Sequence, residues 1–447
     1  MTANKQPRSR ISWTSFRAPN PALILAVAFV TTVVTMPAQA KIKVLYTFTG
    51  GADGGYPAGS LIEDAKGNLY GTAELGGNLN CAPPGGCGTV FELTTAGKFI
   101  LLHTFAGGTD GASPYAALLM DAAGNLYGTT SAGGGASGCF GNGCGTVFKI
   151  DPKGTETVLY SFQGKADGGL PYSTLIMDKA GNFYGTTFVG GDLSCSLSSS
   201  GCGTVFKLTN TGKETVLYSF TGGTDGAYPP DEALAVDSTG NFYGTTSRGG
   251  DLSCSPPDGC GTVFKLAKTG KQTVLHAFTG AAAGPAAADG ELPESGPILI
   301  DGYLYGTTVA GGAFGLGTVY SIKLAGDVFK TLHSAEGGPN DGARPYAAPA
   351  NAAQAYAAPN SDAGGDALLY ILYGLGAHDY GDFVEEKGEY YHELAAFEYE
   401  VTGGSPLGQA LDSAARDSIV FTLSQGGSTT QGPGAGTLAA CPKTKCK

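Results

Sequence analysis

Ten cysteines arranged in close pairs are the first residues of this sequence whose spacing predicts chemistry. Four pairs occupy the same loop of four successive repeats, and a fifth pair lies close to residue 447: Cys81/Cys87, Cys139/Cys144, Cys195/Cys202, Cys254/Cys260 and Cys441/Cys446. Zinc is the competing interpretation, but the four repeat loops carry no His beside their cysteines. The pattern therefore favours disulfides closed within each loop, in an oxidising compartment.

Six aspartates form a second candidate site, because each begins an Asp-Gly-x-x-Pro motif. These residues are Asp53, Asp110, Asp167, Asp225, Asp289 and Asp341. One interpretation is a set of carboxylates around a central channel that binds a ligand such as a cation. The other is that each Asp caps a turn and ties neighbouring repeats together, which is the usual role of a residue required once per repeat.

The five histidines point less clearly to chemistry. His103, His276 and His333 stand where other repeats have Tyr, which indicates strand positions. His378 and His392 lie in a divergent segment rich in acidic residues, where either a metal or acid/base site or a solvated acidic loop would fit. No Ser-His-Asp order, phosphate-binding loop or metalloprotease motif is present, so the sequence names no cofactor.

These residues are positioned by an internal repeat. The motif Gly-Asn-Leu/Phe-Tyr-Gly-Thr occupies residues 67–72, 124–129, 181–186 and 240–245, with a weaker copy at 302–307. Each copy is followed by a Gly-rich loop and then by Gly-Thr-Val-Phe or Gly-Thr-Val-Tyr, at 88–91, 145–148, 203–206, 261–264 and 317–320. The first two copies are 57 residues apart, from Gly67 to Gly124.

Each repeat holds four short strand-like segments and no segment long enough for a periodic helix. Repetition at this length predicts an all-β fold, a β-propeller of six four-stranded blades over residues 41–401. A β-solenoid would have shorter coils, and separate sandwiches would need linkers that the sequence does not show.

The sixth repeat is degraded, and residues 367–370 and 393–401 can supply strands there. The strand-like residues 43–48 have no blade of their own, so we expect them to pair with the sixth blade and remove two exposed sheet edges. Residues 418–423 could fill that place instead. Residues 402–447 are predicted to form a largely flexible extension.

Composition and charge indicate export. Residues 1–40 have four basic and no acidic residues, an apolar run over 22–34 and the small-residue site Ala38-Gln39-Ala40. This pattern is typical of a secretory signal peptide, with an uncleaved anchor as the alternative. The net charge of −12 argues against nucleic-acid binding. We expect a secreted, periplasmic or cell-surface protein that has no membrane span after cleavage.

The Leu-Tyr-Gly-Thr-Thr and Gly-Thr-Val-Phe-x-Leu motifs resemble those of the GloVer tandem-repeat family of exported bacterial proteins. The resemblance covers residues 43–323 well and the next repeat weakly. It implies variable C-terminal surface anchors, which the tail of this chain, ending in Cys446 and Lys447, does not match. It implies no established reaction.

The sequence therefore predicts a binding or structural module whose partner is an extracellular glycan, an envelope polymer or a protein. The alternative is an extracellular lyase or hydrolase that uses the central channel. An enzyme would need unique polar residues in one or two blades, and residues 374–393 alone show such asymmetry. Alternation of loops along each blade places the Cys-bearing loops and the Asp-Gly-x-x-Pro turns on one face, opposite the Asp-x-x-Gly-Asn turns.

Overall fold

The computed structural model describes residues 41–136, 138–280, 289–337 and 343–345, together with the strands at 392–398 and 420–423. The predicted signal peptide, Asp341, His378 and the pair Cys441/Cys446 lie outside these residues. Helical structure in the described ranges is limited to the short element η1 (Cys139–Gly141) and to Gly280, and everything else there is strand, turn or loop. No helix in the described part of the chain is long and apolar enough to cross a membrane.

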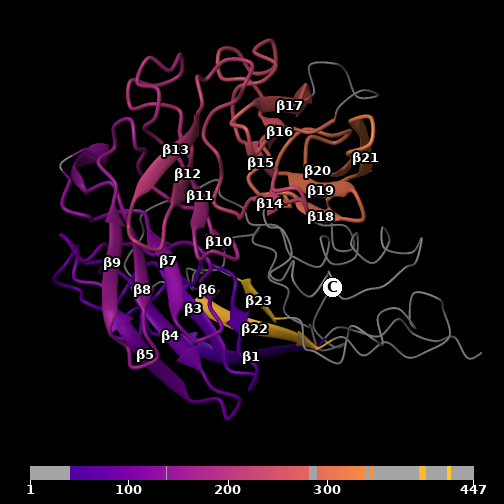
Figure 1. The fold of residues 1–447 in the computed structure, drawn as a ribbon. Helices are drawn as coiled ribbons and strands as arrows, with labels where there is room; N and C mark the ends of the chain where they lie inside the picture. Colours follow the sequence, from indigo (N-terminus) through magenta and orange to yellow (C-terminus); the bar gives the residue numbers. More distant parts are fainter. Residues whose placement is uncertain are drawn as a thin grey trace, which may run out of the picture. The chain divides into compact units, whose positions relative to one another are not determined.

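Five antiparallel sheets of four strands follow one another along the chain, and we number them blades 1 to 5 (Figure 1). Blade 1 contains β2 (Ile62–Glu63), β3 (Leu69–Ala73), β4 (Thr89–Leu93) and β5 (Phe99–Thr104). Blade 2 contains β6 (Leu119–Met120), β7 (Leu126–Thr130), β8 (Thr146–Ile150) and β9 (Glu156–Ser161). Blade 3 contains β10 (Ile176–Met177), β11 (Phe183–Thr187), β12 (Thr204–Leu208) and β13 (Glu214–Ser219). Blades 4 and 5 contain β14 (Ala235–Val236), β15 (Phe242–Thr246), β16 (Thr262–Leu266) and β17 (Gln272–Ala277); β18 (Ile298–Ile300), β19 (Tyr303–Thr308), β20 (Thr318–Lys323) and β21 (Val328–Ser334).

In every blade the strands pair in chain order, as in the blades of a β-propeller. The all-β propeller class predicted from the repeat is therefore confirmed. The predicted number of six four-stranded blades is not confirmed, because the described residues form five complete four-stranded sheets.

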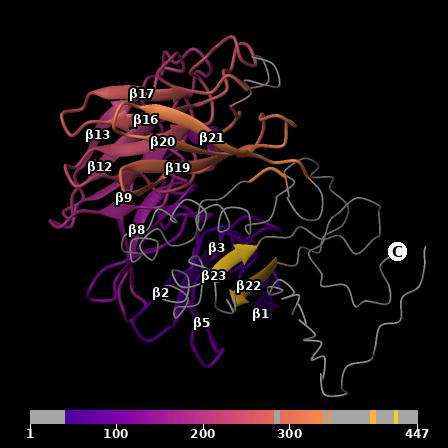
Figure 2. The same cartoon turned by 90° about the vertical axis from the view of Figure 1, so that its right-hand side faces the viewer.

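A further sheet of three strands joins the two ends of the repeat region. Here β1 (Lys41–Phe48) pairs antiparallel with β22 (His392–Glu398), which also pairs with β23 (Val420–Leu423), as Figures 1 and 2 both show. Pairing of the N-terminal strand with C-terminal chain is thus observed. Both candidate C-terminal segments contribute a strand, whereas the segment 367–370 lies outside the described residues.

The two repeated motifs are explained by one contact. In blade 2, Gly128 lies opposite Phe148 across the β7–β8 pair. A Cβ on Gly128 would come within 2.6 Å of the Phe148 ring, so the glycine makes room for the aromatic side chain. The same pairing joins Gly71 to Phe91, and it is repeated in the other blades.

Successive blades are joined by buried hydrogen bonds from the Thr that follows this glycine. The hydroxyl of Thr72 donates to the carbonyl oxygen of Ala116 at 3.0 Å, and that of Thr129 donates to Ser173 at 3.3 Å. Thr245 makes the equivalent bond to Ser295 at 2.8 Å. The conserved spacing of the motif therefore also fixes the contact between neighbouring blades.

The Asp-x-x-Gly-Asn turns between the first two strands are held by their Asp side chains. Asp178 accepts hydrogen bonds from the backbone and side-chain amides of Asn182 and from the hydroxyl of Tyr184. Burial opposes ionisation of Asp178, but these hydrogen bonds outweigh it and lower its pKa to about 2. The carboxylate is thus a structural acceptor that explains why Asp, Asn and Tyr recur together.

Candidate functional site

The four predicted disulfides within the repeats are confirmed: Cys81–Cys87, Cys139–Cys144, Cys195–Cys202 and Cys254–Cys260. Their Cα–Cα distances lie between 5.2 and 5.8 Å. Each closes the loop between the second and third strands of its blade, and we call these four the stapled loops. Four disulfides are typical of proteins in an oxidising compartment.

Each disulfide packs against the Gly-rich turn that leads into the next blade. A Cβ on Gly107 would lie 2.5 Å from the Cys81 sulfur, and one on Gly280 would lie 2.7 Å from that of Cys254. Beyond this turn, the N–H of Tyr228 donates to the carbonyl oxygen of Cys202 at 2.9 Å, and the equivalent bond recurs in each blade junction up to blade 5. The stapled loops and the Asp-Gly-x-x-Pro turns therefore lie together, as the sequence predicts.

The motif aspartates lie within these turns, and their carboxylates accept hydrogen bonds from nearby residues. Asp167 accepts hydrogen bonds from the Tyr160 hydroxyl at 3.0 Å and from the Gln163 amide at 2.8 Å. The same arrangement is found at Asp53 and Asp225, while Asp110 accepts from the amide of Ala106. These contacts favour the turn-capping interpretation. A binding role for the set stays a prediction, and no group of three potential metal ligands occurs in the described ranges.

Two of the histidines replace Tyr as the partner of a motif Asp. His276 Nε2 lies 2.7 Å from Asp289, and its ring stacks on Phe329 with 3.6 Å between centroids. His103 Nε2 lies 3.3 Å from Asp110. Burial lowers the pKa of His103, although Asp110 acts in the opposite direction. These histidines are strand residues, as expected; His392 lies in β22.

Three of the four stapled loops present a large apolar side chain to solvent, a feature that the sequence analysis missed. Leu79, Leu193 and Leu252 are 42%, 49% and 39% exposed, and Phe314 of the unstapled fifth loop is 56% exposed. We call these four the loop-tip residues. In the third loop, Asp192 accepts hydrogen bonds from the backbone and hydroxyl of Ser194 and so fixes the turn that carries Leu193.

A second missed feature is a cluster of carboxylates at the start of blades 4 and 5. It consists of Asp231, Glu232 and Glu294, and all three are half-buried. Burial, followed by the charges of Glu232 and Glu294, raises the pKa of Asp231 well above its ordinary value, and Tyr115 hydrogen-bonds to its carboxylate. Burial raises the pKa of Glu232 to about 7. It also raises that of Glu294, which nearby Arg248 opposes.

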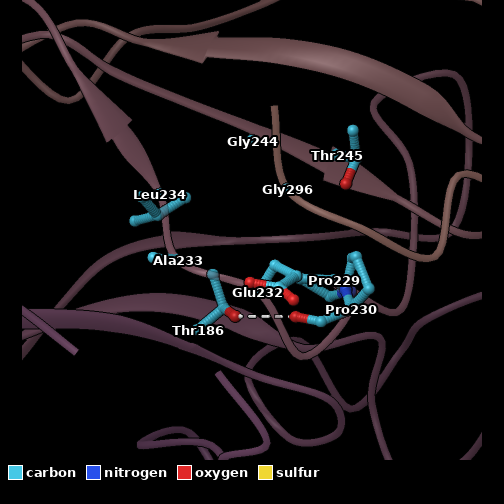
Figure 3. Close-up of a pocket in the computed structure, with 9 residues that line it drawn as sticks. All are labelled: Thr186, Pro229, Pro230, Glu232, Ala233, Leu234, Gly244, Thr245 and Gly296. Atoms are coloured by element: carbon cyan, nitrogen blue, oxygen red, sulfur yellow. Dashed lines mark hydrogen bonds between the residues drawn. The ribbon is translucent and has the colours of Figure 1, made fainter. Parts of the chain in front are cut away.

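Glu232 of this carboxylate cluster lines a small pocket of about 10 Å³, which is room for roughly one water-sized group. The pocket is lined by Thr186, Pro229, Pro230, Glu232, Ala233, Leu234, Gly244, Thr245 and Gly296. Figure 3 shows Glu232 beside the two prolines, with the Thr186 hydroxyl donating to the Pro230 carbonyl oxygen at 3.5 Å. Glu232 is thus the ionisable side chain that lines the pocket.

Four aromatic rings continue from this cluster towards blade 2, and we call them the aromatic row. Tyr115, which hydrogen-bonds to Asp231, contacts Tyr172 edge-on with 5.7 Å between ring centroids. Tyr172 contacts Phe188 at 5.8 Å, and Phe188 stacks on Tyr228 at 4.9 Å. All four residues are half-buried. Tyr228 directly precedes the pocket residue Pro229.

The comparison that decides the family is a match of the Gloeobacter/Verrucomicrobia repeat to residues 31–197 and 137–298. The chain belongs to the Gloeobacter/Verrucomicrobia repeat family. This confirms the resemblance read from the motifs. No curated protein matches the chain.

Among solved structures, the chain resembles a protein described as a putative gluconolactonase at 14% identity and a TM-score of 0.35, covering 68% of this chain and 87% of that one. It resembles a luciferin-regenerating enzyme at 12% identity and a TM-score of 0.37, covering 69% and 89%. It also resembles TolB from Acinetobacter baumannii at 11% identity and a TM-score of 0.34, covering 76% and 60%.

Within the Gloeobacter/Verrucomicrobia repeat, a length difference marks the carboxylate cluster. Blades 1 to 3 have three residues between the motif Pro and the buried Leu that directly precedes the first strand, as from Pro171 to Leu175. Blade 4 has four, from Pro229 to Leu234, whereas blade 5 again has three, from Pro293 to Pro297, because Ile298 pairs with Tyr305 as Ile176 pairs with Tyr184. The extra residue and the acids it accompanies were visible in the sequence, so unique polar residues are not restricted to residues 374–393.

Proposed function

We propose that this protein is an exported binding module whose stapled loops engage an extracellular glycan, envelope polymer or protein. The observation that carries the proposal is the repeated exposure of a large apolar side chain at the loop tips. Large apolar side chains exposed at equivalent places in several loops can together provide an interaction surface. Export is supported by the signal-like residues 1–40 and by the four disulfides.

The stapled loops also meet the physical requirement for tight binding. Each is closed by a disulfide that packs on the turn of the following blade, so the loop loses little conformational entropy when it contacts a partner. The loops are therefore preorganised rather than shaped by the partner.

The test is a pull-down of cell-envelope fractions with the protein and with a variant that carries Leu193→Asn and Leu252→Asn. The cysteines and the turn-fixing Asp192 and Asp251 remain in place, so the fold should survive. We expect the variant to lose most of the captured material. The matched control replaces Met177 and Val236, which are exposed at 37% and 42% on first strands, by Ser. Equal capture by wild type and the loop-tip variant would refute the proposal.

The competing candidate is an extracellular hydrolase or lyase, and one observation favours it. Glu232 borders a pocket and has its pKa raised to about 7, which suits a general acid at neutral pH. Turnover of glycan substrates that Glu232→Gln abolishes would support this alternative.

A further inference from the structure

The aromatic row and the pocket beside it form one continuous feature over blades 2 to 5. It runs from Tyr115 through Tyr172 and Phe188 to Tyr228, and the next residues in the chain, Pro229 and Pro230, line the pocket. Asp231 and Glu232 follow directly. The hydrogen bond between Tyr115 and Asp231 connects the carboxylate cluster to the first ring of the aromatic row.

The chemistry of this feature restricts its occupant. Pro229 and Pro230 have no N–H, and the hydroxyls of Thr186 and Thr245 already donate to backbone carbonyls. The pocket wall thus offers apolar surface and the Glu232 carboxylate rather than a ladder of backbone donors, which an extended peptide would use. The aromatic row adds half-buried aromatic side chains, which can contact a sugar ring.

Acidic side chains predominate near the pocket. Asp231, Glu232 and Glu294 lie close enough for Asp231 to sense both glutamates, and Arg248 offsets a part of this charge at Glu294. A ligand that combined a ring with a protonated amine would contact the aromatic side chains, and its charge would favour ionisation of these carboxyls, which burial opposes.

We propose that the aromatic row and the adjoining Glu232 pocket bind a glycan that carries free amino groups, that is, an oligomer of amino sugars that are not acetylated. The sugar rings lie on Phe188 and its neighbours, and an ammonium group lies against Glu232. This inference rests on the proposed function as a binding module, and it assigns that module a ligand class and a second contact region beside the loop tips.

Blade 1 supplies a matched control. Phe188 follows the second strand of blade 3, and the same position is Glu74 in blade 1 and Ser131 in blade 2. Replacing Phe188 by Ser therefore installs a side chain that the repeat already carries there. Burial raises the pKa of Glu74 to about 7, as it does that of Glu232, so Glu74→Gln changes charge equally outside the row.

The experiment is isothermal titration of the whole protein with a glucosamine hexamer, in two buffers of different ionisation enthalpy. We expect binding by the wild type and by Glu74→Gln, and a loss of about tenfold or more in Glu232→Gln and in Phe188→Ser. The observed heat should depend on the buffer, because an ammonium beside carboxyls of raised pKa expels protons. Circular dichroism confirms that each variant is folded.

Four results would overturn the inference. These are absence of binding to the glucosamine hexamer, equally tight binding of the fully acetylated hexamer, equally tight binding of a lysine hexapeptide, and a loss of binding in Glu74→Gln as large as that in Glu232→Gln. Cleavage of the hexamer by the wild type would show that the site is catalytic and would also reject the inference.

Failure of this inference and failure of the proposed function are distinguishable. Loop-tip substitution at Leu193 and Leu252 should leave hexamer binding unchanged, because neither residue lines the pocket or belongs to the aromatic row. Envelope capture that persists without hexamer binding would reject the amino-sugar site alone.

Discussion

Phe48, the last residue of β1, packs edge-on against Phe91 of blade 1, with 5.1 Å between the ring centroids. The same contact, at the same distance, joins Phe105 after blade 1 to Phe148 of blade 2, and Phe162 to Phe206. Strand β1 therefore stands to blade 1 as the fourth strand of each blade stands to the blade that follows. This equivalence is the physical reason to regard β1 as the closing strand of a preceding sheet.

The first prediction follows from this contact. Phe48 and Phe105 are both fully buried, so replacing either by Ala should lower the free energy of unfolding by about 3–5 kcal/mol. Deleting residues 41–48 should lower the melting temperature at least as much as Phe48→Ala does. Phe314→Ala, at an exposed loop tip, is the control and should change stability little. An undiminished melting temperature in Phe48→Ala would show that β1 is not part of the folded core.

The second prediction concerns the glycine of the repeat motif. In Gly128→Ala the new Cβ would lie 2.6 Å from the Phe148 ring, which must move, so we expect a loss of about 1–3 kcal/mol. Gly85→Ala is the control, since its nearest neighbour would lie 3.6 Å away.

The cause can be isolated with a double-mutant cycle measured by chemical denaturation. Phe148→Leu removes part of the ring that obstructs the new Cβ, so the loss in the double variant should be smaller than the sum of the single losses. Additive losses would mean that the glycine serves another purpose.

The third prediction concerns the staples. Replacing Cys195 and Cys202 by Ser removes a cross-link that closes a small ring, and the loss should be at most about 2–3 kcal/mol on the chain-entropy model. Under reducing conditions, limited proteolysis should cut the stapled loops, while the rate of cleavage in the loop of blade 5, which has no cysteines, should not change. Free thiols at Cys81 or Cys87 in the exported protein would contradict the pairing.

The fold could largely be predicted from the sequence because its determinants are local and repeated. The Asp-x-x-Gly-Asn turn, the glycine opposite Phe and the Cys pairs each act within one blade, so four complete copies and a weaker fifth indicate the same structure. The closing strand could be anticipated because residues 43–48 copy the fourth strand of a repeat without having the other three.

The sequence could not show what depends on contacts between blades. The residue before each motif Pro has a positive φ although it is not glycine, as at Leu170 (54°) and Tyr228 (55°). Residues before proline favour extended conformations, so the left-handed one is imposed by tertiary contacts, among them the hydrogen bond to the preceding Cys carbonyl. The aromatic row likewise exists only because Tyr115, Tyr172 and Phe188 come from positions that the repeat does not conserve.

A last relationship between blades produces the pH dependence that we predict. Glu156 and Glu214 begin the fourth strands of blades 2 and 3, and each has a buried carboxylate oxygen without a hydrogen-bond partner. Burial, with a smaller contribution from the charge of Asp110 or Asp167, raises the pKa of each to about 7. The equivalent residue of blade 4 is Gln272, whose side-chain amide donates to the Asp225 carbonyl oxygen at 3.2 Å.

The direction in which stability changes with pH follows from the number of protons bound in the folded and unfolded states. In the unfolded chain a Glu ionises near pH 4.5, whereas in the folded protein these two remain protonated until about pH 7. The folded state therefore holds more protons between these values, and the free energy of unfolding falls as the pH rises from about 4.5 through 7. Because the side chains are only half-buried, we expect a loss of about 1–2 kcal/mol for each, less than the full pKa difference would give.

Glu156→Gln and Glu214→Gln should each remove this loss, raising stability at pH 8 while changing it little at pH 4.5. The new amides can donate to the carbonyl oxygens of Asp110 and Asp167, as Gln272 does to that of Asp225. The reverse substitution, Gln272→Glu, should introduce the same pH-dependent loss into blade 4. Urea denaturation at both pH values measures these differences, and a Glu214→Gln variant whose stability still falls in parallel with the wild type across this range would show that Glu214 is not responsible.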